Sequence, residues 1–130
     1  MFHLLNYFDK YQMYKDTFFQ FLVVMEDRYN SRRNPFHNFE HGFTVAHACY
    51  YMIKNKLLDP FLDETEQFAA ILSALCHDVD HTGRTNGFEV ARMSKLAVRY
   101  NDESVLENHH ASMTFKIMAR EKYNILSNLS

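Results

Sequence analysis

Apolar residues recur at helical spacing along most of this chain. In the segment from residue 14 to 30, Phe18, Leu22, Met25 and Tyr29 lie three or four positions apart, which places them on one face of a helix. The 130 residues include only three glycines and two prolines, so long segments run without helix breakers. No segment alternates apolar and polar residues as a strand would. The pattern predicts an all-α fold.

Cap residues predict where the later helices begin. A polar connection at residues 31–33 leads to Asn34-Pro35, a cap residue before proline, which predicts a helix from there to about residue 53. Asp63, with Glu66 three positions later, predicts the start of the next helix. Its expected buried face consists of Phe68, Ile71, Leu72 and Leu75. Two short helices are expected within residues 87–99, and a last long helix is expected over residues 103–121, capped by Asp102.

Charge and composition exclude several classes of protein. The formal net charge is only −2 and no basic run occurs, which argues against binding to nucleic acid or to an anionic membrane. The most apolar run, residues 18–25, is too short to span a membrane. The first residues lack the features of a signal peptide. Cys49 and Cys76 form no pair motif and are expected to be reduced, buried thiols. A cytoplasmic location is expected.

Seven of the eight histidines lie between residues 37 and 110, and three of them directly adjoin a carboxylate. Imidazoles and carboxylates are ligands for divalent metals, and further histidines suit acid–base chemistry. His37 and His41 are four apart, so on a helix they would share a face. Either one binds a metal while the other reaches a substrate, or both bind one ion. The spacing leaves this open, and an ordinary pair of surface histidines has the same spacing.

The His77-Asp78 doublet follows a strongly apolar helix. Neighbouring residues on a regular helix point apart by roughly 100°, so the two can converge on one ion only where the helix ends or loosens. Gly83 fits a nearby helix end. Both carboxylate oxygens of Asp78 could bind, which would let it bridge two ions. Asp80 and His81 are expected to extend this polar cluster.

A third cluster contains Glu107 and His110, which are three apart and share a helix face, whereas His109 points elsewhere. One interpretation is a contact within the helix, worth about 0.2–0.5 kcal/mol. Another is a pair of side chains that hold metal-bound waters and ligand rings in place.

Taken in order, these motifs resemble the class I 3′,5′-cyclic nucleotide phosphodiesterases, which belong to the superfamily of His-Asp metal hydrolases. The matching residues are His37-Asn38-x-x-His41, then His77-Asp78-x-Asp80-His81-x-Gly83-x-x-Asn86, then the stretch from Tyr100 to His110. The resemblance covers about residues 4–130 and is nearest to the calmodulin-regulated branch. It implies a multi-helix bundle that hydrolyses cAMP or cGMP to the 5′-monophosphate with two divalent ions.

The resemblance also implies roles for individual residues. His41, His77 and Asp78 would bind the first ion, zinc, and Asp78 would bridge to the second, magnesium or manganese. His37 would be the general acid that protonates the departing ribose O3′. The residues beside the second ion and the phosphate would be His81, Glu107 and His110. This division suits two-metal chemistry, in which ions about 3.5–4 Å apart activate water and stabilise in-line attack on phosphorus.

The chain departs from the family in length. The family's catalytic domain is more than twice as long, and it places a further aspartate ligand and the purine-binding residues later in the sequence. Residues 1–130 are therefore expected to be the N-terminal part of the domain, truncated at its C-terminal side, and to need the missing part for hydrolysis. Phe36 and Phe39 stand where many members have Tyr and Trp. A homodimer and regulatory domains remain open, as does the preference between cAMP and cGMP.

Other functions fit part of the pattern. The chain could be another His-Asp phosphohydrolase, which a substrate screen would separate from a cyclic nucleotide phosphodiesterase. It could also be a non-catalytic metal-binding fragment. A di-iron site is a further alternative, although Glu107-x-x-His110 is the one match to the Glu-x-x-His repeats that such sites favour.

Overall fold

The computed structural model describes residues 1–29 and 34–129, and every regular element among them is helical. The all-α prediction is confirmed, while the connection predicted at residues 31–33 lies outside the described residues. The elements are α1 Tyr7–Lys10, α2 Lys15–Arg28, α3 Phe39–Lys54, α4 Glu64–Cys76, α5 Asn86–Ala91, α6 Lys95–Arg99, α7 Val105–Met118 and the short 3₁₀ helix η1 Glu121–Tyr123.

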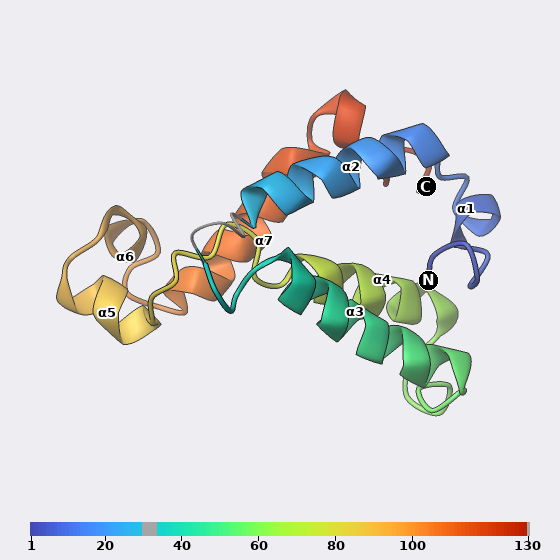
Figure 1. Cartoon of the computed structure of the whole chain (residues 1–130), viewed down its shortest axis with the longest axis horizontal. Coiled ribbons are helices and arrows are strands. Elements are labelled where there is room, and N and C mark those ends of the chain that lie inside the picture. Colours follow the sequence, from blue (N-terminus) through green and yellow to red (C-terminus); the bar gives the residue numbers. More distant parts are fainter. Residues whose placement is uncertain (30–33, 130) are drawn as a thin grey trace.

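Helices α3 and α4 lie side by side, α2 crosses the body on its other side near α7, and α5 and α6 project from one end (Figure 1). Gly42 lets α3 approach α4 closely. A Cβ at this position would lie 3.2 Å from the carbonyl oxygen of Leu75 and 2.7 Å from the hydroxyl oxygen of Tyr29. The missing side chain therefore sets how closely these three segments pack.

Helix α4 follows its sequence signals. Asp63 and Glu66 form the predicted capping box, in which each side chain accepts from the other residue's backbone N–H. The predicted apolar face is buried, with Ile71 and Leu75 almost completely inaccessible. The core it enters also contains large side chains from α1, from α2 and from the residue that follows α2, namely Tyr7, Phe21, Met25 and Tyr29.

Helix α3 begins four residues later than predicted. Its cap is Asn38, whose side-chain oxygen accepts from the N–H of His41. Asn34 is not a helix cap, because its side chain is used elsewhere: its oxygen accepts from the N–H of His37, and its amide nitrogen lies 3.4 Å from the carbonyl oxygen of His81. Residues 35–38 form a turn, so His37 precedes the helix.

Helix α7 also begins later than predicted. Residues 101, 102 and 104 have left-handed backbone angles, so Asp102 cannot cap a helix that starts at Glu103. The first turn is capped from outside: the side-chain oxygen of Asn86 accepts from the N–H of Leu106 at 2.9 Å. The helix ends at Met118 rather than near residue 121.

Cys49 and Cys76 are buried and free, as predicted. Burial raises the pKa of Cys76 to about 12 and raises that of Cys49, so both thiols stay protonated. None of the helices found in residues 1–29 and 34–129 has the length and apolar character that crossing a membrane requires.

Candidate metal centre

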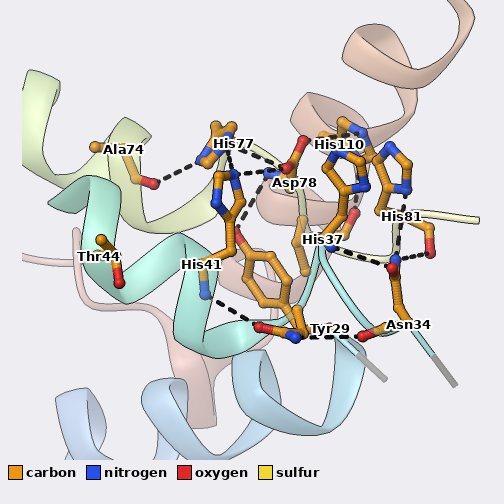
Figure 2. Close-up of polar contacts among 12 residues, drawn as sticks. Tyr29, Asn34, His37, His41, Thr44, Ala74, His77, Asp78, His81 and His110 are labelled. Carbon is orange, nitrogen blue, oxygen red and sulfur yellow. Dashed lines mark hydrogen bonds and ion pairs between the residues drawn. The ribbon is translucent and has the colours of Figure 1, made fainter. Parts of the chain in front are cut away.

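Three ligand atoms meet where α3 begins and α4 ends (Figure 2). His41 lies in the first turn of α3, His77 caps the C-terminus of α4, and Asp78 follows directly. The Nε2 atoms of the two histidines are 3.2 Å apart, and Asp78 Oδ2 lies 3.3 Å from that of His41 and 3.2 Å from that of His77. These three residues form the first ligand group.

The size of this triangle matches a metal coordination sphere. Ligands about 2.0–2.2 Å from a tetrahedral zinc lie about 3.3–3.6 Å from one another, because a tetrahedron's edge is about 1.6 times its centre-to-corner distance. The observed separations of 3.2–3.3 Å are close to that range. The donor set of two imidazoles and one carboxylate is also one that zinc accepts.

Backbone carbonyls fix which nitrogen of His77 and His110 is free. His77 Nδ1 lies 2.8 Å from the carbonyl oxygen of Ala74, and His110 Nδ1 lies 2.7 Å from that of Val79. A carbonyl only accepts, so each Nδ1 carries a proton and each neutral ring presents the lone pair of Nε2. The free lone pairs of both rings point toward Asp78.

Asp78 also belongs to a second ligand group with His81 and His110, and its Oδ1 lies 3.8 Å from His110 Nε2. Asp78 therefore offers one oxygen to each group. His81 differs from the other histidines because its Nδ1 accepts from the N–H of Gly83 at 2.9 Å. Its Nε2 consequently carries the proton in the neutral ring, which makes His81 a hydrogen-bond donor toward this space.

The electrostatics keep Asp78 charged and favour the neutral forms of His81 and His110. Burial alone would raise the pKa of Asp78, but the hydrogen bond that His77 donates from Nε2 when its ring is protonated, together with the positive charge of nearby histidines, outweighs burial and lowers that pKa to about 2. The same hydrogen bond raises the pKa of His77. Burial lowers the pKa of His81 to about 4, helped by repulsion from His37, and burial also lowers the pKa of His110.

His37 lies beside the two ligand groups with both ring nitrogens unbonded to any described residue. Its ring stacks on His81, with centroids 3.9 Å apart and planes 14° from parallel. The predicted shared helical face with His41 is wrong, because His37 lies in the turn before α3, yet the two rings still meet at 5.8 Å. Phe36 packs against both rings, at 4.9 Å from His37 and 5.0 Å from His41.

Asn34 is a member of this site that the sequence did not reveal. It is 96% buried, and its amide nitrogen lies 3.5 Å from Nδ1 of His81 and 3.4 Å from the carbonyl oxygen of the same residue. Its side-chain oxygen accepts from the N–H of His37. Asn34 therefore ties His37 to His81, and no local sequence signal distinguishes this role from a helix cap.

Glu107 lies on the cleft beside the second ligand group but is not a member of it. The side-chain amide of Asn86 donates to both of its oxygens, at 2.9 and 3.2 Å, and this contact is the largest cause that lowers the pKa of Glu107. Asp80 does not extend the cluster as expected. It pairs instead with buried His109 at 2.8 Å and belongs to neither ligand group.

A cleft of about 760 Å³ opens over the site between α4 and α7. One end is polar and contains His37, Asp78 and His110, whereas the remainder is apolar and includes Leu72 and Met118. The volume lies within the range of small-molecule sites, about 300–1,000 Å³. A charged group would find its partners at the polar end and an uncharged ring system would fit the apolar part.

Known proteins resemble this chain in sequence and in fold. Residues 36–130 match the family model for 3′5′-cyclic nucleotide phosphodiesterase. A "dual specificity calcium/calmodulin-dependent 3′,5′-cyclic nucleotide phosphodiesterase 1" from Drosophila melanogaster is 46% identical over 110 residues, which are 85% of this chain and 13% of that protein. The human "high affinity cGMP-specific 3′,5′-cyclic phosphodiesterase 9A" is 39% identical over 129 residues, 99% of this chain and 21% of that protein.

Solved structures agree over nearly the whole chain. The crystal structure of the phosphodiesterase domain of a rhodopsin fusion protein from the choanoflagellate Salpingoeca rosetta superposes with a TM-score of 0.89 at 36% identity. A second crystal structure of the phosphodiesterase domain of the Salpingoeca rosetta rhodopsin phosphodiesterase gives 0.91, also at 36% identity. This chain is covered to 99% in both, but it spans only 40% and 38% of theirs.

Proposed function

The chain belongs to the 3′5′-cyclic nucleotide phosphodiesterase family, and on that premise we propose that it forms the metal-binding part of a domain that hydrolyses 3′,5′-cyclic nucleotides to 5′-monophosphates. One observation carries the proposal: Asp78 is shared by two ligand groups, and His37 stands beside them with an imidazole that hydrogen-bonds to none of the described residues. Residues 1–130 would act with the rest of such a domain, which would bind the purine.

We propose that His41, His77 and Asp78 hold zinc and that Asp78 also faces a magnesium or manganese ion near His110. Two observations support the first site. The three ligand atoms are spaced like the corners of a tetrahedral coordination sphere, and the Nε2 lone pair of His77 is free to bind. The shared carboxylate supports the second. Divalent ions bound there would supply Lewis-acid stabilisation of the phosphoryl oxygens and an activated water.

The chain's own side chains would divide the remaining work. His37 would hold a proton at a ring nitrogen and pass it to the departing O3′, which suits a histidine whose nitrogens bond to none of the described residues. His81 would donate its Nε2–H to a phosphate oxygen, because Gly83 occupies its other nitrogen. Glu107, fixed by Asn86, would accept from water on the same side of the cleft.

The cleft would bind the cyclic nucleotide with its phosphate at the polar end and its base toward the apolar part. Whether cAMP or cGMP is preferred is left to the part of the domain that binds the purine. We also assign the protein to the cytoplasm, since two buried free thiols fit a reducing compartment.

The metal proposal is tested on the 130-residue chain itself. After dialysis against zinc, the bound metal is counted by elemental analysis for the unsubstituted chain, Asp78→Ala and Asp27→Ala. Asp27 is an exposed carboxylate on α2 and serves as the matched control. We expect zinc in the unsubstituted chain and the control and none in Asp78→Ala. Equal zinc in all three would contradict the proposed ligands.

The catalytic proposal is tested in a chimera in which this sequence replaces the matching segment of the Drosophila relative. His37→Ala should lower cyclic nucleotide hydrolysis by about 10²–10⁴-fold, the usual contribution of a general acid, and leave bound zinc unchanged. His47→Ala, an exposed histidine on α3, is the control and should change neither. A folded, zinc-loaded chimera that hydrolyses other phosphate esters but no cyclic nucleotide would favour another His-Asp phosphohydrolase.

A further inference from the structure

The last turn of α4 is opened by the side chain of Tyr29, the residue that follows α2. In a continuing helix the N–H of Asp78 would bond to the carbonyl of Ala74. Here that carbonyl lies against Nδ1 of His77, and the N–H of Asp78 bonds to the hydroxyl of Tyr29 at 3.3 Å. The same hydroxyl donates to the carbonyl of Leu75 at 2.8 Å. Tyr29 therefore stands between two backbone groups at the point where the helix ends (Figure 2).

This opening is what the doublet needs to bind one ion. Neighbouring side chains on an unbroken helix diverge by roughly 100°. In this turn His77 Nε2 and Asp78 Oδ2 instead lie 3.2 Å apart. From this geometry we infer that Tyr29 is a positioning residue for the metal centre, which sets the direction of the Asp78 carboxylate through the backbone of Asp78. The inference rests on the proposed metal site.

Tyr29 is built to hold a fixed position. Its side chain is fully buried and packs edge-to-face on Phe39, with ring centroids 5.9 Å apart. Gly42 leaves the space that the hydroxyl occupies, since a Cβ there would come within 2.7 Å of it. Burial raises the pKa of Tyr29 well above its ordinary value, so the hydroxyl stays protonated and can both donate and accept. Removing it would leave the N–H of Asp78 without its partner.

A matched control lies at the other end of the same helix. Tyr11 is also a buried tyrosine, and its hydroxyl donates to the carbonyl of Glu64 at 3.2 Å, at the start of α4. Tyr11→Phe and Tyr29→Phe each delete one buried hydroxyl that bonds to the backbone of α4. Of the two tyrosines, only Tyr29 contacts the turn that carries His77 and Asp78. If the role of Tyr29 were purely structural, the two variants would bind metal alike.

The test is a titration of the 130-residue chain with Co²⁺, whose visible spectrum reports coordination geometry. We expect Tyr29→Phe to keep its helicity by circular dichroism, to bind Co²⁺ about 10–100-fold more weakly, and to change the visible band. Tyr11→Phe should match the unsubstituted chain in affinity and spectrum. Unchanged affinity and spectrum in a folded Tyr29→Phe, or an equal loss in Tyr11→Phe, would overturn the positioning role.

A second measurement needs no substitution. The amide proton of Asp78 in the unsubstituted chain should exchange slowly with solvent because it is bonded to a buried hydroxyl. Rapid exchange in the folded chain would overturn the inference even if Tyr29→Phe does not fold.

The proposed metal site and the proposed role of Tyr29 fail in different ways. An unsubstituted chain that binds no Co²⁺ refutes the metal site, whereas equal binding by the unsubstituted chain and Tyr29→Phe refutes only the role of Tyr29.

Discussion

Replacing Gly42 with alanine tests how closely α2, α3 and α4 must pack. The new Cβ would lie 2.7 Å from the hydroxyl oxygen of Tyr29, 2.9 Å from its Cζ and 3.2 Å from the carbonyl oxygen of Leu75. All three distances are below ordinary contact, which for carbon atoms begins at about 3.5 Å. Neither neighbour yields easily, since one is a fully buried ring and the other is helix backbone.

Two opposing contributions set the magnitude. Alanine in place of glycine within a helix stabilises by about 0.8–1.0 kcal/mol. Overpacking a tight interior costs about 1–3 kcal/mol. The free energy of unfolding should therefore fall by about 0–2 kcal/mol in Gly42→Ala. The matched control is Gly87→Ala, because Gly87 also lies in a helix, α5, but a Cβ there meets nothing within 4 Å.

The assay is urea unfolding followed by far-ultraviolet circular dichroism. Gly87→Ala should be more stable than the unsubstituted chain by up to about 1 kcal/mol, from helix propensity alone. The difference between the two variants removes that contribution and should equal the packing cost, about 1–3 kcal/mol. If Gly42→Ala stabilised the chain as much as Gly87→Ala does, the close packing described for Gly42 would be wrong.

Two further predictions concern charge. The folded chain resists protonation of His81 and His110 because burial lowers their pKa values, to about 4 for His81, whereas in the unfolded chain both titrate near 6.5. Between these pKa values the unfolded state binds more protons than the folded state. The melting temperature of the metal-free chain should therefore fall as the pH drops from 6.5 to 4, and His81→Asn should make that fall shallower. An equally steep fall in the variant would contradict this reasoning. Asn86→Ala should let the pKa of Glu107 rise toward its ordinary value of 4.5. The measurement is the carboxyl chemical shift of Glu107 as a function of pH, and an unchanged pKa would show that Asn86 is not the main cause of the lowering.

Local signals predicted the parts of the fold that local contacts determine. The capping box of Asp63 and Glu66 and the apolar spacing of α4 involve residues within one or two turns of one another, and the structure confirms both. The sequence predicts starts for α3 and α7 that are too early, because the contacts that decide them are distant in sequence. Asn34 bonds to His81, 47 residues away, and α7 is capped by Asn86, 20 residues before Leu106.

The candidate site shows the same division. The doublet of His77 and Asp78 at a helix end could be read from an apolar run followed by polar residues, and the requirement for a loosened helix could be stated in advance. The residue that loosens the helix end could not be predicted from local sequence. The spacing predicts that Tyr29 is buried, which is correct although the residue lies just beyond the end of α2, but its hydroxyl finds partners 46 and 49 residues further on.

The long sequence separation between Tyr29 and α4 has a consequence for the order of folding. Helix α4 carries its own cap and can begin to form early, because the capping box and the hydrogen bonds within the helix join residues that are close in sequence. Its final turn takes its shape only after α2 docks, which requires closing a loop of more than forty residues. During refolding, a divalent ion would therefore meet a helix whose His77 and Asp78 still diverge. Metal uptake would follow the docking of α2 and not the growth of helix content, which makes the bound ion a reporter of tertiary assembly.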